Sequence, residues 1–354
     1  MSKTEATVTG KLILTGKIRL KTPLIIGSGT ADLSNIEVLR DEKGNPFIPA
    51  TSFVGVLRHY IEEKSSQENP TRSNYFWGAN TDDGSQSALC CRDLITGRAI
   101  IKIRDGVAID SKTGIAIDEK KYDYEVVEPG ALFDLHMEVT VREAFDKGIF
   151  KRILSTIVNL LDGKISFGAK TTSGFGRCKL ENMKYYEFDF SKQDDVWRWL
   201  NQEFLQGITL DGDPLPIKQN AFIVDAVFSI KNSLIVKSYA HDPDSSDAVH
   251  VKSANKNVLP GTSIKGAIRA RGLKILKTLE WTDAEDMIDK LFGMVDEKKK
   301  EKIKSRVTVE ETEIKNVAAE LQHRIKIDRF TGGVIKTALF DSMPLWGDGN
   351  DKAV

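Results

Sequence analysis

The sequence is poor in cysteine and lacks any long apolar run. It holds three cysteines among 354 residues, Cys90, Cys91 and Cys178, and none has a Cys/His spacing suited to zinc. We therefore expect a reducing, cytoplasmic setting. No apolar run approaches the roughly 20 residues that cross a bilayer, and the polar N-terminal residues are not typical of a secretory signal. These absences argue against a disulfide scaffold, a zinc-binding protein and a membrane-spanning protein.

An excess of charge of either sign is also missing. The chain carries 51 basic and 51 acidic residues, so its overall charge gives no support for nucleic-acid binding. Any contact with RNA must come from local clusters. Hydrophobic residues make up 40% and charged residues 29% of the chain, which is typical of a globular protein. The length is sufficient for two domains of ordinary size.

An internal repeat at a spacing of about 210 to 220 residues organises the chain. The recurring residues are Pro49, Thr51, Ser52, Gly55 and Arg58, matched by Pro260, Thr262, Ser263, Gly266 and Arg269; Phe76-Trp77-Gly78, matched by Leu291-Phe292-Gly293; and Ile109, Asp110, Thr113 and Gly114, matched by Ile327, Asp328, Thr331 and Gly332. Because the matches keep their order, they indicate a tandem duplication. We call its halves copy one and copy two.

The composition predicts where the copies meet. Residues 1–190 form the first domain, 191–220 a linker with a short helix followed by Gly and Pro loop signals, and 221–354 the second domain. Copy two is much shorter after Gly332 than copy one is after Gly114. We therefore expect copy two to be truncated or to be completed by another chain.

Apolar periodicity predicts an α+β fold in each copy. Apolar strands are expected at 11–20 and at 221–230, the latter in the same role in copy two. Helices are expected from Phe53 to Ile61 and from Phe150 to Leu161, with Ser52 and Ser263 as N-caps of the repeated helix. Strand, helix and strand in this order, twice, predict two tandem ferredoxin-like domains with helices on one face of each sheet.

Two kinds of segment offer places for RNA phosphates. A helix N-terminus with Thr and Ser and nearby basic residues can bind phosphate, and the Gly-rich stretch 168–177 allows close approach of a backbone. An ordinary capped helix and a tight β-turn are the structural alternatives. The run 298–306 is also basic, but we interpret it as a solvated helix face. The candidate RNA-binding residues are Thr51, Ser52, Arg58, Lys170, Gly174, Gly176 and Arg177 in copy one, and Thr262, Ser263, Lys265, Arg269 and Arg271 in copy two.

The motifs, taken together, resemble those of the RAMP superfamily of CRISPR-associated proteins. They are Pro-(Gly/Ala)-Thr-Ser-x-x-Gly-x-(Leu/Ile)-Arg, Phe-Gly, Ile-Asp-x-x-Thr-Gly and Ser-Gly-Phe-Gly-Arg, and they cover residues 8–190 and 221–346. Within the superfamily the pattern is most similar to the backbone subunits of type III effectors, here two fused in one chain. The resemblance implies RNA-recognition-like folds along a guide RNA, a hairpin "thumb" near 104–128, other RAMP-type subunits as partners, and a complementary target RNA.

The resemblance also implies cleavage of the target RNA with a divalent metal, Mg²⁺ or Mn²⁺. The family's aspartate lies five residues before a basic position, which places Asp247 before Lys252, itself a candidate RNA contact. The same count in copy one gives Asn35, with Asp32 three residues earlier as a substitute. From the residues alone, an acidic loop can hold a metal or accept the proton of a 2′-hydroxyl, although a solvated acidic loop is the alternative. Asp247 is the candidate catalytic and metal-binding residue of copy two, and Asp32 the catalytic candidate of copy one.

Other functional classes stay open or fit less well. A non-catalytic scaffold that binds the guide RNA without cutting is favoured in copy one by Asn35. A guide-processing ribonuclease would use a histidine-centred mechanism, and the five histidines show no matching cluster. A nucleotide-binding enzyme is not supported, because the stretch 261–266 lacks the order of a phosphate-binding loop.

Overall fold

The structure is a computed structural model of the whole chain. It describes residues 7–27, 36–65, 75–78, 86–110, 113–218, 220–238, 246–296 and 300–347. Asp32 and Asn35 lie outside the described residues.

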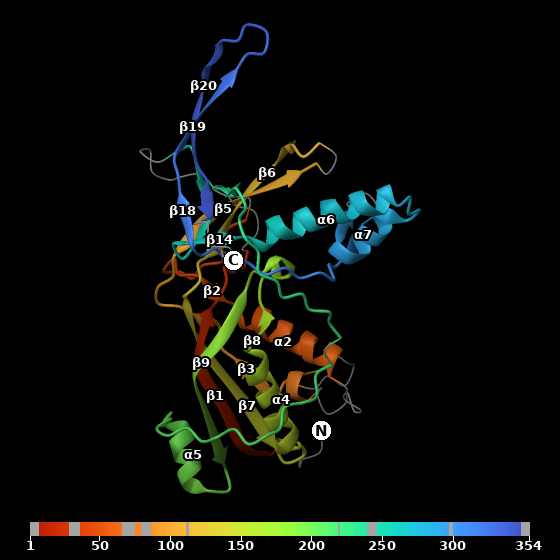
Figure 1. Cartoon of the computed structure of the whole chain (residues 1–354). Coiled ribbons are helices and arrows are strands. Elements are labelled where there is room, and N and C mark those ends of the chain that lie inside the picture. The colour runs from red at the N-terminus through yellow and green to blue at the C-terminus, as the bar shows by residue number, and fades with distance from the viewer. Residues whose placement is uncertain are drawn as a thin grey trace.

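Copy one is built on a five-stranded antiparallel sheet in the order β3-β7-β1-β9-β8 (Figure 1). The strands are β1 (Val8–Leu20), β3 (Leu89–Cys91), β7 (Leu132–Arg142), β8 (Asp162–Ser166) and β9 (Arg177–Asp189). Helices α2 (Ala50–Lys64) and α4 (Lys147–Leu160) pack against one face. Leu12 and Leu14 face these helices, while Ile13 packs with Tyr186 and Phe188 on the other face. The central strand β1 is therefore buried on both faces, and the predicted α+β architecture is confirmed.

The two helices predicted from periodicity in copy one are both present. Phe53, Leu57 and Ile61 are buried on α2, and the apolar face of α4 is buried in the same core. The predicted N-caps are wrong, because α2 and α6 (Gly261–Thr278) begin directly after Pro49 and Pro260. Each proline holds an extended conformation one residue before its helix, so the serines lie within the first turn.

Each copy carries a protruding two-stranded hairpin, which we call thumb one and thumb two. Thumb one is β5 (Ile101–Ile109) with β6 (Ala116–Val127), and thumb two is β19 (Gln322–Ile327) with β20 (Val334–Met343). The repeated Asp and Gly close both tips in the same way. The Gly114 amide donates to the Asp110 carbonyl at 2.8 Å, and the Gly332 amide to the Asp328 carbonyl at 2.9 Å. Both glycines have positive φ, 70° and 67°, which explains why the turn requires glycine.

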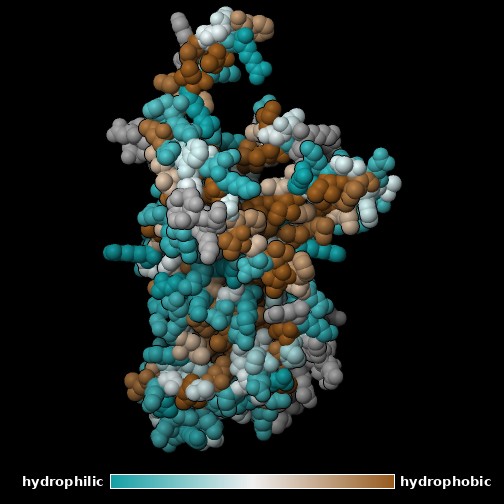
Figure 2. All heavy atoms as spheres, viewed as in Figure 1, coloured by the Kyte–Doolittle hydropathy of each residue, from teal (hydrophilic) through white to brown (hydrophobic). Residues whose placement is uncertain are grey.

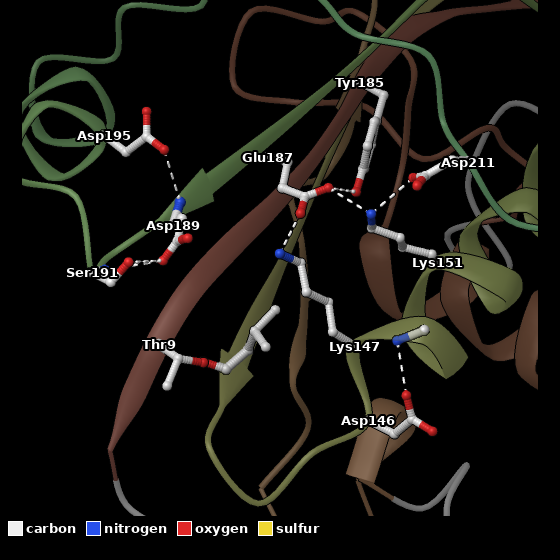
Figure 3. Close-up of polar contacts among 12 residues, drawn as sticks. Thr9, Asp146, Lys147, Lys151, Tyr185, Glu187, Asp189, Ser191, Asp195 and Asp211 are labelled. Atoms are coloured by element: carbon white, nitrogen blue, oxygen red, sulfur yellow. Dashed lines mark hydrogen bonds and ion pairs between the residues drawn. The ribbon is translucent and has the colours of Figure 1, made fainter.

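A polar cluster anchors the linker to copy one (Figure 3). Glu187 on β9 contacts Lys147 and lies 2.8 Å from Lys151 of α4. Lys151 also lies 2.8 Å from Asp211, a linker residue beyond α5 (Gln193–Leu200). Burial raises the pKa of Glu187, but the hydrogen bonds from both lysines outweigh burial and lower this pKa below its ordinary value. The helix predicted in the linker is present, and the segment after it is held against α4.

Copy two has no single central sheet among the described residues. Besides α6 and thumb two, its elements are β10 (Ser233–Leu234), β11 (Lys237–Ser238), β12 (Ala248–His250), β13 (Lys252–Ser253), β14 (Lys256–Leu259), α7 (Ala284–Phe292), β15 (Met294–Asp296), β16 (Glu301–Ile303), β17 (Thr312–Glu313), β18 (Val317–Ala319) and β21 (Leu345–Gly347). Copy one also contains β2 (Phe47–Ile48), β4 (Leu94–Ile95) and the 3-10 turn η1 (Thr171–Ser173). The strand predicted at 221–230 is wrong, because this segment forms no strand and pairs with no described residue. The helix face expected for 298–306 is also wrong, since the described part of that run includes β16 of a hairpin.

A buried ionic cluster joins the two copies. Arg104 of thumb one lies 2.7 Å from Glu311 and also contacts Ser253, both in copy two. The Ser253 hydroxyl donates to Glu311 at 2.5 Å, and the Ala254 amide donates to Glu128 at 2.5 Å. The side chains of Arg104, Glu128 and Glu311 are at most 6% exposed. Such groups are stable in the interior only when they are paired, so the contact between the copies is specific.

Candidate nucleic-acid interface

A groove of about 1060 Å³ lies between the repeated helix of copy one, the Gly-rich loop and a segment of copy two. Helix α2 contributes Thr51, Ser52 and Gly55, and the region from Gly163 to Arg177 forms a second wall. Residues from Lys304 to Glu310 form a third wall, so the groove is composite. The structure thus brings together Thr51, Ser52, Gly174 and Arg177, four of the seven candidates in copy one.

Gly55 presents an open stretch of backbone in this groove. It is exposed, and a Cβ atom built on it would meet no heavy atom within 4 Å. The repeated Gly266 is equally open. Glycine in a helix interior costs about 1 kcal/mol relative to alanine. No neighbouring protein atom excludes a side chain at Gly55, so the open surface there leaves room for a ligand.

The start of α2 already has an anionic partner. The Ala50 amide donates to Asp93 Oδ1 at 2.7 Å, so one free N–H group of the first turn is satisfied by a carboxylate. No side-chain cap comes from Pro49. The remaining polar groups in the groove at this end are the exposed hydroxyls of Thr51 and Ser52. Sequence reasoning did not identify Asp93, which lies 43 residues from Ala50 along the chain.

The space beside the two loop glycines, Gly174 and Gly176, is filled by protein backbone. A Cβ atom on Gly174 would lie 2.4 Å from the Glu311 amide nitrogen, and one on Gly176 would lie 1.8 Å from the Phe167 carbonyl oxygen. Both glycines have positive φ, 88° and 77°. The close approach expected at these positions is therefore made by the protein itself, and at Gly174 it is made by copy two. RNA contact by these two glycines stays a prediction.

The groove has more basic than acidic side chains. Its basic residues are Lys64, Lys164, Arg177 and Lys304, and its acidic residues are Glu63 and Glu310. Arg177 contacts Glu310 of copy two and donates to the Gly163 carbonyl at 2.9 Å. Sequence reasoning missed Lys304 as a groove residue, although the basic run 298–306 was a usable signal. This local excess of positive charge contrasts with the zero net charge of the chain.

Several other RNA candidates have protein partners. Arg58 pairs with Glu62 at 2.9 Å and does not line the groove. Arg269 pairs with Asp289 at 2.5 Å and donates to the Gly293 carbonyl, which ties α6 to α7 and its following turn. Arg58 and Arg269 therefore occupy equivalent positions in their helices, but Arg58 pairs within its own helix, whereas Arg269 pairs with a residue of another helix.

Lys265 joins copy two to the Gly-rich loop. Its Nζ donates to the Thr172 hydroxyl at 2.8 Å, and burial together with Arg269 lowers its pKa. Gly261 is buried beside Ser173 at the same contact. The half-buried Thr262 and Ser263 follow directly, so the start of α6 lies against copy one. Lys252 and Arg271, the remaining candidates, are exposed.

Lys170 is directed toward thumb one. Its Nζ lies 3.4 Å from the ring centroid of Tyr124 and donates to the Tyr122 hydroxyl at 3.2 Å. Burial, and secondarily the charge of Arg104, lowers the pKa of Lys170 to about 8. Lys170 does not line the groove. Its RNA contact stays a prediction, and its observed partners are the two tyrosine rings.

Asp247 lies at the base of thumb two, exposed and next to β12. Its Oδ2 accepts a hydrogen bond from the Asp341 amide at 3.0 Å. The Asp341 side chain contacts His323 Nδ1 at 2.7 Å. The sequence did not identify Asp341 or His323 as companions of Asp247, because thumb two folds back to bring them together. The backbone of Asp341 thus lies beside the candidate residue, and the Asp341 side chain pairs with His323.

His250 does not belong to this acidic cluster. It is 3% exposed, its Nδ1 accepts from the Val236 amide at 3.1 Å, and its Nε2 lies 2.8 Å from the Val258 carbonyl oxygen. Burial lowers the pKa of His250 more than the hydrogen bond to Val258 raises it. The ring therefore holds backbone segments together in copy two.

The donors near Asp247 partly fit a divalent metal. Magnesium is commonly held by one or two carboxylates together with substrate phosphates and water. Asp247 supplies one exposed carboxylate, and Asp341 adjoins it through its backbone amide. Within the described ranges no group of three or more His, Cys, Asp or Glu is arranged to hold a metal ion. Any metal held by Asp247 would therefore depend on phosphate or water ligands as well.

A membrane-spanning helix is not found among the described residues: none of the helices there is both long and apolar enough.

The family model of the RAMP superfamily matches residues 17–179 and 234–346, which is more than half of the chain. The chain therefore belongs to the RAMP superfamily, and its two matched regions fit the two tandem copies. The family indicates a CRISPR-associated RNA-binding protein that acts in a multi-subunit complex. No curated protein matches the sequence significantly. The domain boundaries at 190 and 220 remain predictions.

Proposed function

We propose that this chain is a guide-RNA-binding backbone subunit of a cytoplasmic type III CRISPR effector, and that copy two cleaves the complementary target RNA. The composite groove beside α2 is the observation that carries the proposal. It combines an exposed helix face without a side chain at Gly55, two hydroxyls at Thr51 and Ser52, and four basic side chains. These are groups that contact a sugar-phosphate backbone without reading its sequence.

Binding in the groove would involve both copies. Arg177 belongs to copy one and Lys304 to copy two, and both line the same space. Glu310 already contacts Arg177, so a phosphate at this position would compete with that carboxylate. An arginine can hold a phosphate through two parallel N–H bonds, which makes such an exchange favourable. The guide RNA would thereby strengthen the contact between copies.

Target cleavage would use the groups at the base of thumb two. RNA carries its own nucleophile, the 2′-hydroxyl, which would attack the adjacent phosphorus when the strand is held in line, while Asp247 accepts its proton. The P–O5′ bond would break, and the departing 5′-oxygen would take a proton from water. The Asp341 amide fixes one oxygen of Asp247, and His323 contacts the Asp341 side chain. Asp247 and Asp341 would hold the Mg²⁺ or Mn²⁺ ion, which when bound would stabilise negative charge on the phosphate.

A non-catalytic scaffold is the second candidate function. Copy one has Asn35 where the resemblance implies the aspartate, and this observation favours RNA binding without cleavage by that copy. The same groove serves either function. Asp32 remains the alternative catalytic candidate of copy one.

RNA binding is tested by measuring the affinity of the chain for two labelled single-stranded RNAs of unrelated sequence over a range of salt concentrations. Arg177→Ala and Lys304→Ala should each weaken binding to both RNAs to a similar degree. Each should also reduce the slope of the logarithm of the binding constant against the logarithm of the salt concentration by about one, because one phosphate contact is lost. Lys179→Ala is the matched control, since Lys179 is exposed and does not line the groove. Unchanged affinity in both groove variants would refute the proposed binding site.

A further inference from the structure

A second, smaller pocket adjoins the groove of copy one, between helix α4 and strands β8 and β9. Its volume is about 260 Å³, and we call it the side pocket. Each of the three elements contributes two residues, which are Val158 and Asn159 from α4, Asp162 and Lys164 from β8, and Leu180 and Met183 from β9. Lys164 also lines the groove, so the two cavities meet at this residue.

Irregular strand pairing shapes the side pocket. Strand β9 has one more residue in 181–184 than the part of β1 that faces it. Within this bulge Asn182 has a positive φ of 52°, and the exposed Met183 follows it. The register of β8 on β9 also shifts, between Asp162 and Ser166. Bulges redirect side chains and are frequent beside functional sites.

Met183 gives the side pocket an exposed apolar surface. It is the one large apolar side chain that is exposed in α4, β8 and β9, elements that the structure describes throughout, and its exposed fraction is 39%. By contrast, Figure 2 shows apolar side chains gathered over α6 and α7. Val158 and Leu180 are partly buried and pack against the core of copy one. Because a thioether makes favourable contacts with aromatic rings, this part of the pocket suits a flat aromatic ring.

The side pocket also offers a carboxylate and an ammonium group. Asp162 lies 3.0 Å from Lys179, and their side chains are 61% and 50% exposed. An exposed pair of this kind contributes little to stability, so the carboxylate can exchange Lys179 for another donor. Lys164 Nζ donates to Asn159 Oδ1. Since an ammonium group has three donors, further ones remain for a ligand.

Guanine has the chemistry that these two groups recognise. Its Watson–Crick edge presents two adjacent donors, N1–H and N2–H, which one carboxylate binds together, and beside them the acceptor O6, which an ammonium group binds. Adenine has an acceptor at N1, and uracil and cytosine each present one donor group on this edge. Asp162 and Lys164 together therefore favour guanine. Drug-sized ligands occupy pockets of about 300–1,000 Å³, so the smaller side pocket suits a single base.

We propose that the side pocket binds one unpaired guanine of the RNA whose sugar-phosphate chain lies in the groove. Asp162 accepts from N1–H and N2–H, Lys164 donates to O6, and Met183 contacts the face of the ring. Phosphate contacts position an RNA, and base contacts give specificity. The inference rests on the proposed RNA binding in the groove and adds to it one position at which the RNA sequence is recognised.

The test measures the affinity of the full chain for labelled single-stranded RNAs of one length. One is oligouridine, and the others carry a single guanosine or a single inosine at the centre. The guanosine RNA should bind about five-fold more tightly than oligouridine, since a good bidentate contact discriminates by at least this factor. Inosine lacks the N2 amino group, so the inosine RNA should lose most of the gain. Equal affinities for all three RNAs would overturn the proposal.

Asp162→Asn tests the carboxylate directly. The variant keeps the shape of an exposed side chain but replaces one acceptor oxygen by a donor, so the preference for guanosine should fall below two-fold. Lys179→Ala is the matched control, because it removes the present partner of Asp162 and should keep the preference. A preference of unchanged size in Asp162→Asn would overturn the assignment, since the base would then be recognised elsewhere.

Arg177→Ala separates this inference from the proposed function. Arg177 lines the groove but not the side pocket, so its loss should weaken the guanosine RNA and oligouridine equally and keep their ratio. Equal affinities of the wild type for both RNAs, with both weakened by Arg177→Ala, would refute the side pocket and leave the proposed function standing. No effect of Arg177→Ala on either RNA would refute the groove and the inference that rests on it.

Discussion

The carboxylate of Asp247 accepts a hydrogen bond from the backbone amide of Asp341 at 3.0 Å, although 94 residues separate them in the sequence. This contact fixes Asp247 beside the Asp341 backbone, and the Asp341 side chain lies 2.7 Å from His323 Nδ1. A backbone donor holds Asp247 whatever the side chain at 341 is. The role of the Asp341 carboxylate can therefore be separated from the positioning of Asp247.

Asp341→Asn should slow target-RNA cleavage at least ten-fold while target binding is unchanged. The variant keeps the amide that positions Asp247 but removes the second carboxylate of the proposed metal site. The measurement is the single-turnover cleavage rate over a range of Mg²⁺ concentrations, where a weakened metal site shifts the dependence to higher concentration. His323→Ala serves as a comparison, because it removes the neighbour of Asp341 and leaves both carboxylates. A rate equal to that of the wild type in Asp341→Asn would remove Asp341 from the site.

Gly55→Ala should stabilise the chain and weaken RNA binding at the same time. A methyl group at this position meets no heavy atom, so α2 gains up to about 1 kcal/mol in free energy of unfolding. The same methyl group would protrude into the groove where we expect the sugar-phosphate backbone. Urea unfolding and RNA affinity are measured on the same preparation. Gly266→Ala, at the equivalent open position of α6, should give the stability gain alone. Undiminished RNA affinity in Gly55→Ala would show that RNA does not approach this face.

Glu311→Gln should destabilise the contact between the copies strongly. It removes the nearer of the two carboxylates beside the buried Arg104 guanidinium, Glu311 at 2.7 Å, and leaves only Glu128 at 3.8 Å. Removal of one member of a buried ion pair costs roughly 3 kcal/mol. The measurement is the free energy of unfolding in urea. Glu313→Gln is the matched control, two residues along the chain, because its pair with Lys256 is exposed and contributes much less. Equal effects of the two variants would contradict the role of the buried cluster.

Lys170 should make the free energy of unfolding rise with pH. Its pKa is lowered to about 8 in the folded chain by burial, from an ordinary value of 10.5 when unfolded. Between these values the unfolded state binds more protons, so stability increases from pH 8 toward 10.5. In Lys170→Met the free energy of unfolding should rise less between pH 7.5 and pH 9.5 than it does in the wild type. In the exposed control Lys179→Met the rise should persist. A rise of the same size in Lys170→Met would contradict the shifted pKa.

Local patterns predicted the local elements. The buried residues of α2 and α4 repeat every three or four positions, so their helices could be located from the sequence. The turn at each thumb tip depends on an Asp and a Gly four residues apart, and its geometry is likewise local. The segment 221–230 shows the limit of this reasoning. Its apolar residues predict a strand, but a strand exists only where a neighbour pairs with it.

The residues that meet across the fold could not be predicted in this way. Lys304 reaches the groove of copy one because copy two packs on the Gly-rich loop. The basic run 298–306 was a signal for a nucleic-acid contact, but nothing near Lys304 indicated which groove it would line. Asp341 reaches Asp247 because β12 pairs with β20, and His323 lies opposite Asp341 in thumb two. Glycine content did indicate close approach at Gly174, but not that the approaching backbone is that of Glu311.

Cleavage of a labelled RNA complementary to the guide, by the assembled complex with Mg²⁺ or Mn²⁺, tests the catalytic role of Asp247 most directly when the wild type is compared with Asp247→Ala and Asp32→Ala. Target binding is measured in parallel. We expect Asp247→Ala to abolish the cuts made by copy two while binding is retained; loss of a further cut in Asp32→Ala would assign catalysis to copy one as well. Unchanged cuts in both variants would contradict the account, assign the chain to the scaffold function and place the chemistry in another subunit.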